Sequence, residues 1–196
     1  MARDRDTQRK RVYDAEDRAW SWLATPSSEL LTIEQCQALV DKVLASKWLS
    51  NQADMKMQVS LVRRLGGVLV FAGTGNNATI EDRWGTSFGW YYHKKTDKPS
   101  ISLSRQGRQK SVVLHELAHI LQPSGTAAHG WEFCSIYLRL VRHFMGKEAH
   151  DKLKAEFKAG RVRFTKPRAK RTLTHEQREA ATARLAAARA ARSGSI

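Results

Sequence analysis

The sequence predicts an α+β domain that carries a basic C-terminal arm. Apolar residues recur at helical spacing in four segments, 12–23, 32–47, 112–121 and 129–145. Two-residue alternation and short apolar runs indicate strands between residues 55 and 104. We therefore expect helices over a small, mixed or mostly antiparallel sheet. A length of 196 residues suits one compact domain with an appendage, which we place at 1–165 and 166–196.

The two predicted helices nearest the N-terminus are interpreted as structural covers of the sheet. A charged run precedes the first helix, which ends before a break containing Pro and Ser at residues 25–28. Thr32 and Gln35 form a capping box at the start of the second helix, with a Thr at the N-cap and a Gln three residues later. This second helix is expected to run to about Lys47.

Four segments are predicted to be strands. Residues 55–61 and 100–104 alternate apolar and polar side chains, 68–72 form a continuous apolar run, and 88–93 are rich in aromatic residues. Residues 73–78 match the glycine spacing of a dinucleotide-binding loop. That loop must open a helix, and no helical stripe follows here, so we interpret the segment as an ordinary loop.

The predicted helix over residues 112–121 carries the most informative motif. Successive residues of an α-helix are rotated by about 100°, so His115 and His119 lie on one face, one turn apart, where both imidazoles can reach one ion. Glu116 can serve as the general base. His-Glu-x-x-His on a helix is the pattern of zinc hydrolases, and its apolar context favours this interpretation over two core histidines beside a surface Glu.

A catalytic zinc ion needs a third protein ligand besides a water molecule. Pro123 ends the helix, and a short turn can bring the start of the next helix back against it. His129 lies at that start and is the predicted third ligand, with Glu132, one turn further on, as the alternative. The metzincin pattern is absent, because Gly125 stands six residues after His119.

The two motifs together resemble the SprT-like (Spartan-type) zinc metalloproteases over roughly residues 101–141, where His-Glu-x-x-His is followed by His-Gly-Trp-Glu-Phe-Cys. The resemblance implies a zincin-like fold, with His115, His119 and His129 as zinc ligands and Glu116 as the base. SprT-like proteins often carry a C-terminal zinc finger, for which this chain has no cysteines. Residues 8–16 also resemble the opening of a group of uncharacterised HExxH metallohydrolases.

We therefore predict a zinc-dependent metallohydrolase that cuts peptide bonds in proteins, and the resemblance suggests proteins bound to DNA as its substrates. Glu116 would take a proton from water and pass it to the leaving amine. One alternative is a nucleic-acid-binding protein whose zinc is structural, with Glu132 or Cys134 as a fourth ligand. Another is a regulatory peptidase that cleaves a single partner such as a repressor. The candidates for stabilising the oxyanion, none of them preferred, are Tyr91, Tyr92, His93 and Arg105.

The charge of the chain predicts a polyanionic partner. The formal net charge is +15, and the last 36 residues hold ten Lys or Arg against two Glu. Thr174 and Gln177 form a second capping box, and the run behind them has high helix propensity but almost no apolar face. We expect a solvated helix or a disordered arm that binds nucleic acid; the alternative is a solubilising tail. The arm residues expected to bind are Arg168, Lys170, Arg171, Arg178 and Arg184.

The remaining composition indicates a reduced, cytoplasmic protein without membrane contact. No apolar run approaches the roughly 20 residues of a membrane helix, and no apolar segment of a signal peptide follows the charged N-terminus. Cys36 and Cys134 are far apart and lack a Cys-x-x-Cys partner. Cys134 is therefore predicted to be a small buried apolar residue and not a ligand.

Overall fold

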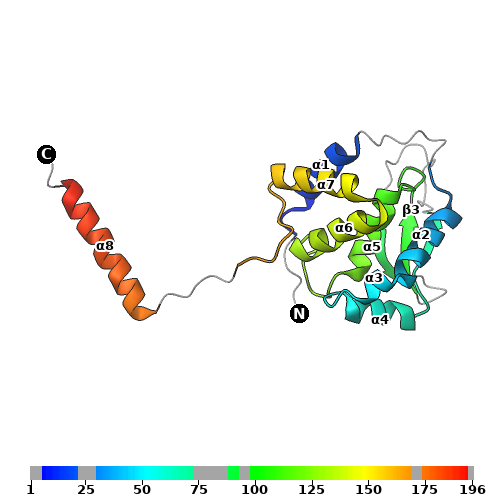
Figure 1. Ribbon diagram of the computed structural model, residues 1–196, viewed down its shortest axis with the longest axis horizontal. Helices are drawn as coiled ribbons and strands as arrows, with labels where there is room; N and C mark the ends of the chain where they lie inside the picture. Colours follow the sequence, from blue (N-terminus) through cyan, green and yellow to red (C-terminus); the bar gives the residue numbers. More distant parts are fainter. Residues whose placement is uncertain (1–5, 22–29, 73–87, 93–97, 169–173, 194–196) are drawn as a thin grey trace. The chain divides into compact units, whose positions relative to one another are not determined.

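The computed structural model describes residues 6–21, 30–72, 88–92, 98–168 and 174–193, and it is shown in Figure 1. The described residues form eight helices and a three-stranded sheet, so the predicted mixture of helix and strand is confirmed. The chain divides into two compact units, Met1–Lys166 and Pro167–Ile196. The predicted break at 25–28 and the loop at 73–78 lie outside the described residues.

The sheet is mixed. Its strands are β1 (Leu69–Ala72), β2 (Phe88–Tyr92) and β3 (Pro99–Leu103), and β3 lies in the centre, parallel to β1 and antiparallel to β2. The expectation of a mostly antiparallel sheet is therefore wrong. Alternating side chains indicate that a segment is a strand, but they do not specify which strand it pairs with or in which direction. As a central strand, β3 is buried at all of its positions except Ser102.

The helix with the His-Glu-x-x-His motif, α5 (Lys110–Leu121), lies between the sheet and helix α6 (Trp131–Phe144). It packs against β2 and β3 on one side and against α6 on another. In turn, α6 packs against α7 (Lys147–Ala159), and α7 packs against the N-terminal helix α1 (Arg9–Trp20). Figure 1 shows α1 and α7 side by side, so the two ends of this unit meet in space.

Helix α2 (Ile33–Ala45) covers β1 and also contacts α5. Its predicted capping box is confirmed: the Thr32 hydroxyl accepts a hydrogen bond from the backbone N–H of Gln35, and the Gln35 side chain accepts one from the backbone N–H of Thr32. Gln37 ties α2 to the sheet, because its side-chain oxygen accepts a hydrogen bond of 2.7 Å from the backbone N–H of Val70.

The predicted strand over residues 55–61 is wrong. After the single-turn helix α3 (Lys47–Ser50), these residues enter α4 (Lys56–Arg64), which packs against α3 and α5. Met55, Val59 and Val62 are buried at i, i+4 and i+7, whereas Met57 is 70% exposed. A short apolar alternation fits the two-residue period of a strand and, in part, the 3.6-residue period of a helix. The helix forms because its period also places Val62 on the buried face.

The C-terminal unit contains α8 (His175–Ser193), in which all described side chains up to Ala187 are exposed. Thr174 and Gln177 form the capping hydrogen bonds that the sequence predicts at its start. Both cysteines are buried and free, as predicted for Cys134. In the part of the chain that the structure describes, no helix has the length and apolar character needed to cross a membrane.

Candidate metal centre

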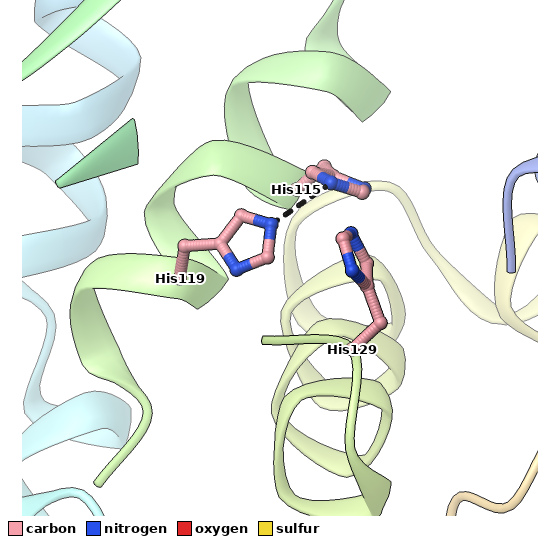
Figure 2. A group of neighbouring side chains, drawn as sticks. All are labelled: His115, His119 and His129. Carbon is pink, nitrogen blue, oxygen red and sulfur yellow. Dashed lines mark hydrogen bonds between the residues drawn. The ribbon is translucent and has the colours of Figure 1, made fainter. Parts of the chain in front are cut away.

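Helix α5 directs two imidazoles toward the same point. The Nε2 atoms of His115 and His119 lie 3.2 Å apart, and Figure 2 shows the two rings projecting from successive turns of the helix. Two nitrogens bound to a tetrahedral zinc ion at about 2.0–2.1 Å are separated by about 3.3 Å. The spacing of one helical turn has therefore brought the two nitrogens to the separation that a shared ion requires.

His129 completes the group from the segment just before α6. Helix α5 ends at Leu121, and the chain reverses through Gly125, which adopts a φ of 86°, in the left-handed region that favours glycine. The Thr126 hydroxyl donates a hydrogen bond of 2.8 Å to the carbonyl of Pro123 and closes this turn. As a result, His129 faces the other two imidazoles, as Figure 2 shows.

The three histidines can hold a metal ion. Their potential ligand atoms all lie within 4.8 Å of one another, with His115 and His129 buried and His119 half-buried. Within the described residues, the Nε2 atom of His129 is buried and has no hydrogen-bond partner. A buried imidazole nitrogen without a partner is costly, and an ion among the three rings would satisfy it. Imidazole nitrogens suit zinc, and they also suit copper, iron and nickel.

Aromatic side chains enclose the three imidazoles. Phe133 on α6 is fully buried and contacts all of them, with ring centroids 4.3 Å from His119, 4.9 Å from His115 and 5.0 Å from His129. Tyr13 on α1 stacks on His115 at 5.7 Å and meets His129 edge-on at 5.1 Å. Tyr13 is nevertheless 39% exposed, so it lies where the group meets solvent.

Two carboxylates from the N-terminal segment bind the far side of the imidazoles. The Nδ1 atom of His115 lies 2.7 Å from Oε1 of Glu16 on α1, and the Nδ1 atom of His129 lies 2.7 Å from Oδ2 of Asp6. Both histidines therefore use Nδ1 for a carboxylate and present Nε2 to the centre of the group. Carboxylate partners of this kind commonly orient metal-binding histidines.

Burial and charge act in opposite directions on the pKa values of these histidines. Burial, together with the neighbouring imidazoles, lowers the pKa of His119 well below its ordinary value. Burial also lowers the pKa of His129, although its hydrogen bond to Asp6 opposes the shift. Burial likewise depresses the pKa of His115, but Glu16 and Glu116 outweigh that effect and raise it. Neutral imidazoles are the form that binds metal ions.

Glu116 lies one position after His115 on α5 and is buried. Burial, followed by the negative charge of Glu116, raises the pKa of Tyr13. The same charge is among the influences that raise the pKa of His115. Glu116 therefore lies close enough to Tyr13 and His115 for its charge to act on both side chains.

The other sequence candidates lie elsewhere or outside the described residues. Among the described residues, the group of His, Cys, Asp and Glu that could share an ion contains only the three histidines, so it includes neither Glu132 nor Cys134. Arg105 is exposed, and the side chains of Tyr91, Tyr92 and His93 are not described. Of the basic arm, Lys170 and Arg171 lie outside the described residues, whereas Arg168, Arg178 and Arg184 are exposed.

Sequence reasoning missed the contribution of the N-terminal segment. Asp6, Tyr13 and Glu16 are more than 95 residues away from the histidines they contact, so no local motif connects them. One signal was available: Glu16 lies on the same helical face as Val12, Ala15 and Ala19, all of which are buried. A carboxylate on an apolar face needs a buried partner, which indicates a role other than packing. The predicted role of this helix as a cover of the sheet is wrong, because α1 packs mainly against α7.

Comparison with known proteins does not extend this assignment: no family model, no curated protein and no solved structure matches the chain. The chemistry of the group must therefore be argued from its own geometry.

Proposed function

We propose that the protein is a zinc-dependent hydrolase that cleaves peptide bonds. The convergence of His115, His119 and His129 beside Glu116 carries this proposal. The likeness of the two histidine motifs to those of SprT-like proteases supports a peptide bond as the target and a zincin-like arrangement of helix and sheet. Three imidazoles also form a ligand set of known catalytic zinc sites.

The number of ligands favours a catalytic ion over a structural one. A structural zinc ion takes four protein ligands, whereas a catalytic one takes three and keeps a position for water or substrate. Among the described residues, no fourth His, Cys, Asp or Glu lies within reach of this group. Cys134 is the nearest thiol in sequence, but burial raises its pKa far above the ordinary range, which disfavours the thiolate that would bind zinc.

The chain supplies two groups for the reaction. When bound, zinc contributes Lewis acidity that activates water and polarises a carbonyl group. Glu116 accepts the proton of the attacking water and delivers it to the leaving amine. Tyr13, exposed above His115, is the side chain that we place beside the substrate carbonyl, where its hydroxyl donates a hydrogen bond to the oxygen as negative charge develops.

The test separates metal binding from hydrolysis. Wild type, Glu116→Gln and Tyr13→Phe are loaded with zinc and incubated with a large pool of peptides, with and without duplex DNA, and new termini are identified by mass spectrometry. We expect Glu116→Gln to bind zinc as wild type does and to lose cleavage, because Glu116 is a base and not a ligand. Tyr13→Phe should keep zinc and cleave roughly a hundredfold more slowly.

Glu148→Gln is the matched control, because it removes an exposed carboxylate at the start of α7. It should leave both zinc binding and cleavage unchanged. Loss of zinc in Glu116→Gln would contradict its role as a base. Cleavage by Glu116→Gln at the wild-type rate would contradict the mechanism altogether. Cuts confined to one peptide sequence would indicate a regulatory peptidase with a single partner.

We propose as a second function that the C-terminal arm binds nucleic acid through phosphate groups. Residues 166–196 hold eight Lys or Arg residues and only two acidic ones. The described side chains of the arm are exposed, and none of those beyond Phe164 is aromatic, so base stacking has no platform there. Such binding should be nearly independent of nucleotide sequence, and log K should fall by roughly 0.9 per phosphate neutralised for each unit of log salt.

Truncation before Lys166 tests this second proposal. Fluorescence anisotropy of one duplex and one single strand is measured with the full chain and the truncated chain at several salt concentrations. If the arm neutralises five or six phosphates, binding by the full chain should weaken about a thousandfold between 50 and 200 mM salt. The truncated chain should lose most of this affinity. Equal affinity and equal salt dependence of the two chains would make the arm a solubilising tail.

A further inference from the structure

The carboxylates of Asp6 and Glu16 are arranged in the same way around the three histidines. Each lies 2.7 Å from the Nδ1 atom of a histidine whose Nε2 faces the centre of the metal-binding group. Neither comes from α5 or from the segment before α6, which carry the three histidines. Both are withdrawn from solvent, with side chains 10% and 23% exposed for Glu16 and Asp6 respectively.

Hydrogen-bond chemistry then determines the tautomer of both imidazoles. An ionised carboxylate only accepts hydrogen bonds, so the Nδ1 atoms of His115 and His129 must donate. A neutral imidazole that donates through Nδ1 has its lone pair on Nε2. The lone pairs of both rings therefore face the place where an ion would be shared. The other tautomer would place an N–H group there and exclude a cation.

The position of the carboxylates is also set by contacts that do not involve the imidazole rings. Helix α1 packs against α7, where Arg18 forms an ion pair of 2.7 Å with Glu156. Just before α1, the Gln8 side chain donates hydrogen bonds to the backbone carbonyls of His129, at 2.6 Å, and Arg163, at 3.0 Å. The segment that carries both carboxylates is therefore anchored to the rest of the fold by contacts of its own.

We propose that Asp6 and Glu16 are positioning residues of the metal centre, which hold His129 and His115 in the tautomer and orientation that bind the ion. This inference rests on the proposed metal centre and adds the N-terminal segment to it. Each carboxylate also places a negative charge behind its imidazole, which makes that imidazole a stronger donor to a cation. Outer partners of this kind typically contribute 10–100-fold to metal affinity.

The experiment measures zinc affinity and tautomers, and it requires no substrate. Glu16→Gln and Asp6→Asn keep the size of each side chain while removing its charge, and they allow an amide to donate to Nδ1 instead. Asp17→Asn, on the exposed face of the same helix, is the control with an identical change of charge. Zinc affinity is determined by competition with a chromophoric chelator. Long-range ¹H–¹⁵N correlation spectra report the histidine tautomers of the metal-free wild type.

The expected result is a 10–100-fold weaker zinc affinity for Glu16→Gln and for Asp6→Asn, with Asp17→Asn equal to wild type. In wild type, His115 and His129 should carry a proton on Nδ1. Zinc affinities within twofold of wild type in both folded variants would overturn the inference. So would a neutral Nε2–H tautomer at either histidine, and this readout stands even if a variant does not fold. Failure of wild type itself to bind zinc would instead refute the proposed metal centre.

Discussion

Phe133 offers a direct test of how the apolar core supports the candidate metal centre. Its ring is fully buried and lies within 5.0 Å of all three imidazoles, and it also stacks on Tyr137 at 5.9 Å. Truncation to Ala would remove the aromatic ring that packs against all three imidazoles. The perturbation therefore acts on packing and on the histidine geometry at the same time.

The magnitude follows from burial. Phe→Ala substitutions in a core typically cost about 3–5 kcal/mol, because transfer free energy is lost and a cavity remains. The free energy of unfolding of a single domain is only about 5–15 kcal/mol, so Phe133→Ala should strongly lower the urea concentration at the midpoint of denaturation. Phe133→Leu keeps more of the volume and should cost about 1 kcal/mol. Zinc affinity should fall roughly tenfold in Phe133→Ala, because the freed rings no longer converge.

Unfolding free energies are measured by urea denaturation of metal-free protein, and zinc affinity by chelator competition. Phe164→Ala is the control, because Phe164 packs against Phe157 at 6.3 Å, and no ring contact links it to the imidazoles among the described residues. It should reduce stability and leave zinc affinity unchanged. A loss below 1 kcal/mol in Phe133→Ala, or unchanged zinc affinity in a folded variant, would refute the coupling of core and centre.

Two further predictions concern buried polar and titratable side chains. Gln8→Ala should lower the free energy of unfolding by about 2–3 kcal/mol, because backbone groups that are bonded to the Gln8 side chain lose their partner. Gln106→Ala, on the surface, is the control and should change it by less than about 0.5 kcal/mol. Both values are measured by urea denaturation. Burial raises the pKa of Cys36 to about 11, so on the order of one thiol in a thousand is ionised at pH 8, and a thiol reagent should react only after unfolding. Because the unfolded chain ionises first, this group should make stability fall as the pH rises from about 9 toward 11; a fast reaction of the native protein at pH 8 would contradict the assignment.

Local signals in the sequence predicted the parts of the fold that depend on local geometry. The Thr32 capping box, the helix of residues 112–121 and the strand at 100–104 all follow from short-range periodicity and hydrogen bonding. The return of His129 to His115 and His119 was also predictable, because a helix stop and a short turn leave few other directions. The group of three histidines is thus largely encoded within the 15 residues from His115 to His129.

What the sequence could not indicate depends on contacts between distant segments. Strand direction in the sheet is one case, since pairing of β1 with β3 joins residues 31 positions apart. The role of Glu16 is another, because its partner His115 lies 99 positions further along the chain. In residues 55–61 the failure was different, since a short apolar alternation satisfies two periods and only the tertiary neighbours decide between them.

The energetics of the core supply the strongest physical reason to expect an ion. Four ionisable side chains, those of Glu16, His115, Glu116 and His129, are buried near one another in a domain whose other core residues are mostly apolar. Each is costly to withdraw from water, and the unsatisfied Nε2 of His129 adds to that cost. Apolar side chains at these positions would give a more stable domain, so stability alone does not account for them. A bound cation would offset this cost, because it would bind the three imidazole nitrogens and balance the negative charge of the carboxylates behind them. Ionisable side chains that are buried at a cost in stability are expected at functional sites.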